Sequence, residues 1–466
     1  MTLTQLLVFS SLALLAAPFS NSQRRGWGLM IASITALYWL QPSTPIRNLD
    51  FWLPTATMAI TVLVWTVTRQ ADEHQQNNQV TGLILLLFIL AIGATRFLPF
   101  HITPSRPPQL LQVTLALGTL GALVLLLSRV KKGRPLLQMI SMLGLLLIFI
   151  LLKNQPLAES LSAVLRRFTG QTTALASAFD IRWLGFSYVS FRLLHTLRDR
   201  LSGRLPQINL RDFITYIIFF PTITAGPIDR IQRFRDDLEN DFRLDTAQTL
   251  EGLKRITIGV LMKFVVADSL ALIALDPSNV FQTPTAAWMW VLVYAFSLRI
   301  FFDFAGYTHI ALGMALLLGF KLPENFDRPY LKTNLTSFWN SWHMTLAQWF
   351  RAYYFNPLTR WLRGRGSPAA AIILVGQFST MVLIGLWHGI TWNFLIWGMW
   401  HGLGLFLHNR WVAFTKTRSQ IPNPQIAQIG GTLVTFHFVA LGWVWFALPE
   451  PEQSLYVLQT LLGWNS

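Results

Sequence analysis

Long apolar runs, each long enough to cross a membrane, alternate with short polar connections along almost the whole chain. A helix needs about 20 residues to cross the hydrocarbon core of a bilayer, and these runs match that length. The sequence therefore predicts an all-α, polytopic transmembrane protein with about 11–13 spans. The expected spans cover residues 3–20, 27–42, 51–68, 79–95, 109–128, 136–152, 174–195, 251–274, 285–302, 305–320, 369–387, 391–408 and 428–447.

Three other stretches carry apolar residues in patterns that do not suit a span. Residues 212–220 are apolar but short, and the prolines and glycine of Pro221 to Pro227 then end any helix. Irregular backbone at membrane depth must be buried in protein or line a cavity. We therefore expect a re-entrant segment here, with a plain interfacial loop as the alternative. The amphipathic stretches 157–168 and 228–250 should form helices at the membrane surface.

Basic residues outnumber acidic ones by 37 to 21, which gives a net charge of +16. Cytoplasmic loops of membrane proteins collect Lys and Arg. The basic connections near residues 24, 70 and 131 should therefore be cytoplasmic, with the N-terminus outside. Arg96 and Arg106 then fall on the outer side, against the rule. No contiguous basic face of the kind that binds nucleic acid is present.

The composition also excludes several kinds of chemistry. There are no cysteines, so disulfides, thiolate nucleophiles and cysteine-ligated metals are ruled out. The sequence contains neither a glycine-rich phosphate loop nor a G-x-S-x-G elbow, so a serine hydrolase is not indicated. No basic stretch precedes the first apolar run, which predicts a first span there rather than a cleaved signal peptide.

Two histidines, each next to a tryptophan, stand in the stretch from Ser337 to Leu403. An ionisable side chain at membrane depth is costly and usually marks function. We expect His388 on a helix, with Thr391 and Trp392 on its side three and four residues further on. The hydroxyl could then fix the imidazole tautomer and the indole could wall a pocket. The residues allow a general acid or base, or else a histidine hydrogen-bonded to a neighbouring helix.

The second histidine, His343, lies in a loop-like aromatic segment of the kind found at membrane interfaces. No acidic cluster stands at ligand spacing beside either histidine, so no metal site is expected. Arg299 and Asp303 lie four residues apart in an apolar run and so share one side of a helix. A salt bridge between them is the first expectation, and Asp303 as part of a site lining is the alternative.

Four sequence blocks follow one another in the second half of the chain. They are Phe220-Pro221 through Ala225–Ile228, Phe302–Tyr307, Asn325–Tyr330 running into Trp342-His343, and Trp387–Gly389 with Trp392 and Trp397-Gly398. In order and spacing they resemble the membrane-bound O-acyltransferases (MBOAT), and more narrowly the bacterial branch of alginate O-acetylation and teichoic acid D-alanyl transfer proteins. The resemblance covers residues 170–410 well.

The resemblance implies an MBOAT fold with a cytoplasm-facing tunnel. In it His388 matches the catalytic histidine, His343 matches the second motif histidine, and Asn325 and Trp342 line the same motif. The domains would be a scaffold of N-terminal helices (1–170), a catalytic core (171–410) and a C-terminal helix with its tail (411–466).

The resemblance further implies a multi-pass protein of the cell inner (plasma) membrane. It would move an acyl group, most simply acetyl, from a cytoplasmic thioester donor to an exported or cell-envelope polysaccharide. The donor would be acetyl-CoA or an acyl-carrier thioester, with no permanently bound cofactor and no metal. A separate extracytoplasmic SGNH-type acetyltransferase would be the partner that completes the transfer.

Three alternatives stay open at this point. Within the enzymes, the chain could transfer D-alanine from an acyl carrier protein to a cell-envelope polymer. Outside them, it could be a small-solute transporter or a scaffold for envelope enzymes. Transporters often show inverted repeats and paired broken helices, whereas this sequence has one clear break and no repeat.

Overall fold

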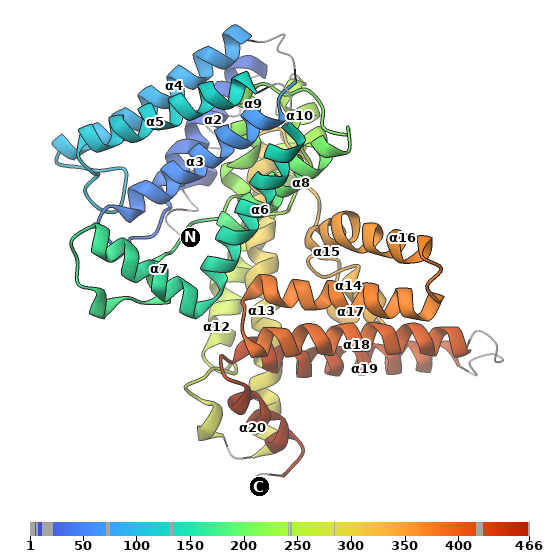
Figure 1. The fold of residues 1–466 in the computed structure, drawn as a ribbon. Helices are drawn as coiled ribbons and strands as arrows, with labels where there is room; N and C mark the ends of the chain where they lie inside the picture. Colours follow the sequence, from blue (N-terminus) through green and yellow to red (C-terminus); the bar gives the residue numbers. More distant parts are fainter. Residues whose placement is uncertain are drawn as a thin grey trace. The chain divides into compact units, whose positions relative to one another are not determined.

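The computed structural model describes residues 5, 8–11, 22–70, 75–130, 134–240, 242, 245–283, 285–415 and 423–464. Regular structure within these ranges is helical (Figure 1). The α-helices are α2 (Ser22–Trp39), α3 (Leu49–Thr68), α4 (Gln75–Ala94), α5 (Leu110–Arg129), α6 (Arg134–Lys153), α7 (Gln155–Phe168), α8 (Phe186–Leu201), α9 (Leu210–Ile217), α10 (Ile231–Glu239), α11 (Thr246–Val260), α12 (Asp268–Ala271), α13 (Ala286–Leu317), α14 (Leu335–Trp339), α15 (Met344–Phe350), α16 (Asn356–Gly364), α17 (Ala369–His388), α18 (Trp392–Thr415), α19 (Pro424–Ala447) and α20 (Pro451–Leu461).

Seven helices in the described part of the chain are long and apolar enough to cross a membrane. This confirms the prediction of an all-α, multi-pass membrane protein. The expected span at 3–20 falls mostly outside the described residues. The seven candidates are Leu49–Thr68, Gln76–Phe97, Leu110–Arg129, Arg134–Lys153, Ala286–Leu317, Ala369–His388 and Gln425–Ala447.

One expected break between spans is absent from the structure. The sequence predicted separate spans at 285–302 and 305–320, but α13 runs through both as one helix of 32 residues. Gly306 lies inside it and serves close packing rather than a break. A Cβ on Gly306 would stand 2.8 Å from the carbonyl oxygen of Gly259, so the two backbones touch because neither residue has a side chain.

The expected span at 174–195 is also different. Short 3₁₀ turns occupy its first part, and α8 begins only at Phe186. Gly185 sets this start: it has φ of 64°, which favours glycine. A Cβ at Gly185 would lie 2.2 Å from the carbonyl oxygen of Ile223. The helix therefore begins where a bare backbone can lie against the segment that follows α9.

Two compact units make up the chain. The first comprises Met1–Ile256 with Ala311–Leu322, and the second comprises Thr257–Ile310 with Pro323–Ser466. This division follows packing, and the three functional blocks predicted from the sequence stay a prediction.

In the first unit, the break predicted after residue 220 is present. The eight-residue helix α9 ends at Ile217, and a 3₁₀ turn follows at Phe220–Thr222. Ending a helix frees carbonyl groups that need donors. Arg192 of α8 supplies them, since its Nη1 donates to the carbonyl oxygens of Tyr216 (3.0 Å) and Ile217 (2.9 Å). The break is thus a buried, hydrogen-bonded feature. The predicted amphipathic helices appear as α7 and as the short α10.

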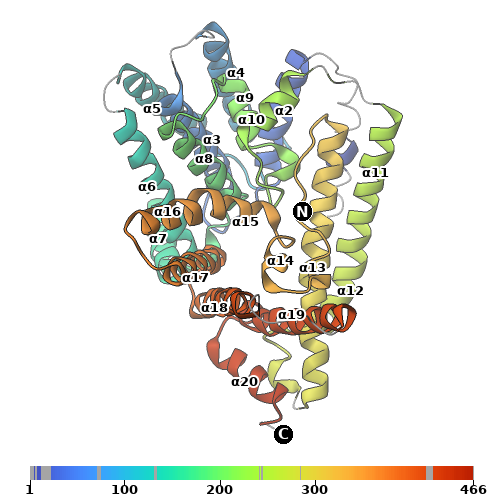
Figure 2. The same ribbon diagram turned by 90° about the vertical axis from the view of Figure 1, so that its right-hand side faces the viewer.

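In the second unit, α17 and α18 form a close hairpin and lie side by side in both views (Figure 1 and Figure 2). Glycines permit this approach. A Cβ on Gly385 would stand 2.2 Å from the carbonyl oxygen of Phe394, and one on Gly398 would stand 2.7 Å from that of Met381. Helix α19 also packs against α18, so α17, α18 and α19 follow one another in one layer of the second unit.

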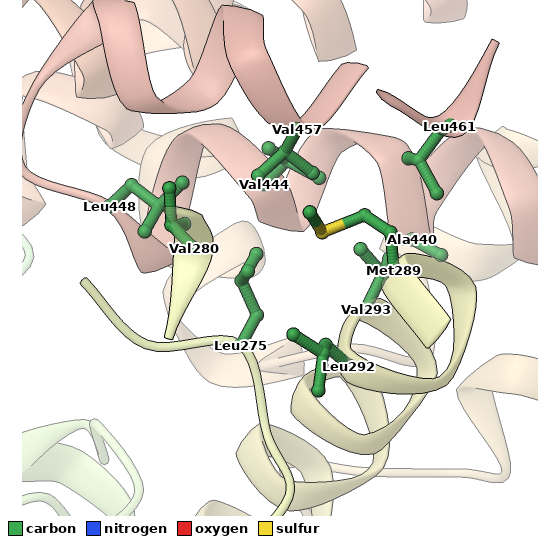
Figure 3. Packing of buried hydrophobic residues seen from close by; sticks show 10 residues of the cluster. All are labelled: Leu275, Val280, Met289, Leu292, Val293, Ala440, Val444, Leu448, Val457 and Leu461. Atoms are coloured by element: carbon green, nitrogen blue, oxygen red, sulfur yellow. The ribbon is translucent and has the colours of Figure 1, made fainter. Parts of the chain in front are cut away.

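The end of the second unit is held by an apolar cluster. Residues from the start of α13, from α19 and from the C-terminal helix α20 pack together with the loop before α13 (Figure 3). Burying such side chains contributes roughly 1.5–3 kcal/mol each. The cluster consists of Leu275, Val280, Met289, Leu292, Val293, Ala440, Val444, Leu448, Val457 and Leu461.

Candidate active site

The turn that carries His343 is unusual in its backbone. His343 precedes the first residue of α15 and has φ of 43° and ψ of 52°, in the left-handed region. A residue with a side chain pays about 1–2 kcal/mol for this conformation. The side chain is 4% exposed, and its Nε2 has no hydrogen-bond partner. The ring packs edge-on against Phe304, with centroids 4.7 Å apart.

Burial also decides the charge of this imidazole. It lowers the pKa of His343 to about 3, because a charged ring would lose its hydration in this position. His343 is therefore neutral at physiological pH. A neutral imidazole has one N–H donor and one nitrogen acceptor.

Asn325 holds this turn in place from a distance in sequence. It is fully buried, and its Oδ1 accepts from the Thr345 hydroxyl (2.6 Å) and the Thr345 main-chain N–H (3.2 Å). Its carbonyl oxygen accepts from the N–H of Met344 (3.0 Å). Asn325 thus caps the first turn of α15, which His343 at the N-cap does not do with its own side chain. The sequence placed Asn325 near the site, and the structure shows how it acts on the backbone.

Trp342 points into an aromatic core rather than toward a polar group. The side chain is 5% exposed and stacks on Phe338, with centroids 5.7 Å apart. Its ring also contacts Trp443 of α19 at 5.0 Å and Tyr330 at 5.7 Å. Trp342 therefore packs the turn against α14, α19 and Tyr330.

His388 is the last residue of α17, and it is half-buried. Its ring contacts three aromatic side chains besides that of its neighbour Trp387. The centroid distances are 4.7 Å to Phe446, 5.6 Å to Trp397 and 5.8 Å to Phe394. The imidazole therefore stands in an aromatic enclosure made by α18 and α19.

Trp387 connects the two histidines. Its ring centroid lies 6.0 Å from that of His343 and 4.4 Å from that of His388. The two imidazoles can therefore be no farther apart than the sum of these distances. The structure brings together two residues that are 45 positions apart in sequence, and the indole between them was not among the predicted site residues.

Thr391 and Trp392, which were expected beside His388, do not lie on the helix that carries it. Gly389 is extended, and α18 begins at Trp392, so the helical spacing that placed Thr391 and Trp392 beside His388 does not exist. The Thr391 hydroxyl instead accepts from the N–H of Phe394 (3.4 Å) at the start of α18. The Trp392 side chain is 69% exposed.

Asp303 is paired, but with a different partner from the one expected. Its carboxylate accepts a hydrogen bond from the Lys263 ammonium and forms the ion pair that the sequence assigned to Arg299. Lys263 lies in a π-helical segment, Leu261–Ala267, and π turns recur at functional sites. Sequence spacing could not reveal this pair, because its members lie on different helices.

A third histidine, His401, was only a lesser candidate in the sequence. It lies on α18, is fully buried, and neither ring nitrogen has a hydrogen-bond partner. Its ring contacts Trp397 at 4.9 Å and Trp339 at 5.2 Å. Trp397 therefore has His388 on one side and His401 on another.

The donor set around the histidines consists of imidazole, amide and indole groups. Within the described ranges, no three His, Asp or Glu side chains are grouped so that they could hold a metal ion. The chemistry that this set can supply is proton transfer by His388 and hydrogen bonding by neutral His343.

Comparison with known families defines the class. A model of the membrane-bound O-acyltransferase family (MBOAT) matches residues 109–445, which is more than half of the 466 residues. The chain therefore belongs to the membrane-bound O-acyltransferase family and is an acyltransferase. This confirms the resemblance read from the four sequence blocks, and membership speaks against a transporter or an envelope scaffold.

Several curated proteins are similar to a large part of the chain. A teichoic acid D-alanyltransferase of Bacillus subtilis (strain 168) is 32% identical over 277 residues, which are 57% of this chain and 69% of the relative. A "probable alginate O-acetylase AlgI" of Pseudomonas putida is 32% identical over 307 residues, 66% of this chain and 59% of the relative. A peptidoglycan O-acetyltransferase of Helicobacter pylori is 34% identical over 290 residues, 58% of this chain and 52% of the relative.

Proposed function

We propose that this enzyme transfers an acetyl group from cytoplasmic acetyl-CoA to an acceptor hydroxyl group. This transfer would be the first step in the O-acetylation of an exported or cell-envelope polysaccharide. The observation that carries the proposal is the contact of the Trp387 ring with the imidazoles of both His343 and His388. Two of the relatives are named for O-acetylation of a polysaccharide or of peptidoglycan. The enzyme would act in the inner (plasma) membrane.

In this proposal His388 is the general base. It accepts the proton of the acceptor hydroxyl while the hydroxyl oxygen bonds to the thioester carbonyl carbon. The tetrahedral intermediate then collapses, the carbon–sulfur bond breaks, and the thiolate takes the proton from His388. The products are an acetyl ester and a free thiol, and the imidazole is returned to its neutral form.

His343 would stabilise the charge that develops on the carbonyl oxygen. Its buried Nε2 has no protein partner and, in the tautomer protonated at that atom, is a donor. Burial keeps the ring neutral, so the ring does not hold an anion before the reaction. Its hydrogen bond to the carbonyl oxygen would then strengthen as negative charge develops there. Asn325 and Trp342 would hold His343, and Asp303, Thr391 and Trp392 stay lower-ranked candidates for the lining.

An extracytoplasmic partner of the SGNH type would receive the acetyl group and pass it to the polymer. The second candidate function is D-alanyl transfer from an acylated carrier protein, because one relative is named for that activity on teichoic acid. The same two histidines would serve either donor. The donor therefore has to be tested directly.

The test uses purified enzyme in lipid nanodiscs with radiolabelled acetyl-CoA or D-alanyl carrier protein, and it is paired with mass spectrometry of exported glycans from producing cells. We expect acetyl-CoA turnover and acetylated glycan, both lost in His388→Ala. His408→Ala, on α18 and hydrogen-bonded to Thr336, is the matched control and should retain both. Turnover of the D-alanyl donor alone would favour the second function, and acylated glycan retained in His388→Ala would remove His388 from its role.

A further inference from the structure

A polar cavity of about 440 Å³ lies in the first unit, far along the chain from the two histidines. Three segments form it: the stretch before α3, the turn after α4 and the start of α5. Three arginines line it together with amide and hydroxyl side chains, and no carboxylate is among the lining residues. The lining consists of Thr44, Ile46, Arg47, Asn48, Arg96, Ser105, Arg106, Gln109 and Gln112.

The walls of this cavity are fixed by hydrogen bonds rather than left as loose loops. Asp50, which is 1% exposed, accepts from the N–H and the hydroxyl of Ser105, both at 2.7 Å. The Asn48 side chain donates to the carbonyl oxygen of Arg106 (2.7 Å). Arg96 Nη1 donates to the carbonyl oxygen of Pro107 (2.6 Å). The Asp50 carboxylate is therefore occupied in holding the loop.

The position of the arginines is unexpected for a membrane protein. Lys and Arg gather in cytoplasmic connections, and Arg69 and Arg129 stand at the far ends of α3 and α5, the helices whose first residues lie near the cavity. Arg47, Arg96 and Arg106 therefore stand on the outer side. The lining contains no carboxylate that could pair with these three cations.

The depth of the cavity in the membrane indicates which kind of anion could bind its arginines. Helices α3, α4 and α5 are each 20 residues long, the thickness of the hydrocarbon core, so the ends that carry the cavity lie at the level of lipid headgroups. Large apolar side chains of the same chain segments are exposed: Phe97 is 70% exposed, Phe100 is 63% exposed and Leu111 is 67% exposed. Of α5, only Val113 and Leu117 are buried, which leaves most of its surface for acyl chains.

We infer that this cavity binds the phosphate headgroup of an anionic phospholipid of the outer leaflet. Guanidinium groups match phosphate oxygens in pairs, and the start of α5 adds the favourable end of a helix dipole. The site is independent of the proposed acyl transfer, because it shares no residue with the catalytic histidines. It would fix the outer ends of α3 and α5, which belong to the part of the chain without catalytic residues.

Native mass spectrometry of the full chain, with added phosphatidylglycerol or phosphatidylcholine of identical acyl chains, tests this inference. We expect the protein to retain phosphatidylglycerol in preference to phosphatidylcholine. The variant R47Q/R106Q should lose roughly fivefold in phosphatidylglycerol affinity for each arginine, the effect of one basic side chain at an anionic surface. Both arginines are exposed, so the variant should fold, and an unchanged thermal midpoint checks this.

The matched control is R24Q/R129Q, which removes two exposed arginines at the other ends of the helices. It should change phosphatidylglycerol retention less than twofold. Equal losses in both double variants would overturn the site in favour of general surface charge. Two results would overturn the lipid assignment. One is displacement of the lipid by inorganic phosphate at comparable concentration. The other is binding of an oligouronate, an anionic sugar chain, that R47Q/R106Q loses while its lipid binding is unchanged. If the double variant does not fold, R47Q alone must show the fivefold loss.

Discussion

The side-chain oxygen of Asn325 accepts two hydrogen bonds from Thr345, one from its hydroxyl and one from its main-chain N–H. This pair joins segments 20 residues apart and starts α15 directly after His343. The amide thereby replaces the cap that the imidazole itself does not supply.

Asn325→Ala is expected to lower both stability and turnover. It removes a helix cap, worth about 1 kcal/mol, together with the hydrogen bond from the buried Thr345 hydroxyl, worth about 0.5–1.5 kcal/mol more. Denaturant unfolding and steady-state kinetics would measure the two effects. Asn334→Ala is the control, since Asn334 caps the nearby α14 in the same way. It should lose stability while keeping kcat, and an equal fall in kcat in both variants would contradict the positioning role of Asn325.

Substitutions of His343 should separate conformation from chemistry. Asn adopts the left-handed conformation readily, so His343→Asn should fold, whereas His343→Val should not. With the imidazole absent, we expect kcat of His343→Asn to fall about 100-fold, the effect of removing one oxyanion donor. Expression level, thermal midpoint and acetyl transfer would be compared. Full activity in His343→Asn would show that the imidazole is not needed.

Acid should destabilise the enzyme through His343. Its pKa is about 3 in the folded protein against about 6.5 when unfolded. Below pH 6.5 the unfolded chain therefore binds a proton that the folded chain does not, so the free energy of unfolding falls as the pH falls from 6.5 toward 3. Thermal midpoints at pH 7.5 and pH 5 should differ more for the wild type than for His343→Asn. Identical pH dependence in the two proteins would contradict the assignment.

Gly385→Ala should damage the hairpin that carries His388. The added Cβ would stand 2.2 Å from the Phe394 carbonyl oxygen, so α17 and α18 must separate. We expect a loss of roughly 1–3 kcal/mol of stability, as for other overpacked sites, and a larger fall in kcat than in substrate affinity. Gly430→Ala on α19 meets no atom within 4 Å and is the control. Retained kcat in Gly385→Ala would mean that the position of His388 tolerates this movement.

Asp303 can be assigned by a double substitution. Asp303→Asn leaves the Lys263 ammonium without its carboxylate, and Lys263→Gln/Asp303→Asn removes both charges. If the pair only holds the two helices together, the double variant should regain the stability and activity that the single variant loses. If Asp303 lines the site, activity should stay low while stability returns. Acetyl transfer and thermal unfolding on the four proteins of this cycle give the answer.

The sequence was most informative where apolar length alone decides the structure. Spans such as α3, α5 and α17 follow directly from runs of about 20 apolar residues. It was misleading around Asp303, where separate spans at 285–302 and 305–320 were expected although α13 is one continuous helix. The carboxylate is instead paired with Lys263 of a different helix, and no local pattern reveals such a partner.

The same limit applies to the candidate site. The four motif blocks identified both histidines and Asn325, but helical spacing placed Thr391 and Trp392 beside His388 although α17 ends at His388. Gly389 ends the helix in an extended conformation, so the spacing from His388 to Thr391 and Trp392 is not helical. The approach of His343 to Trp387 depends on tertiary packing, and spacing in sequence carries no information on that distance.

The left-handed backbone of His343 has a genetic consequence. A histidine codon becomes an asparagine or aspartate codon by one base change, and these two residues tolerate φ of 43° better than most others. A gene copy can therefore lose this imidazole and keep a foldable turn in a single step. Among duplicated genes of this kind, Asn or Asp at position 343 would be the expected mark of a copy that has given up acyl transfer while retaining its place in the membrane.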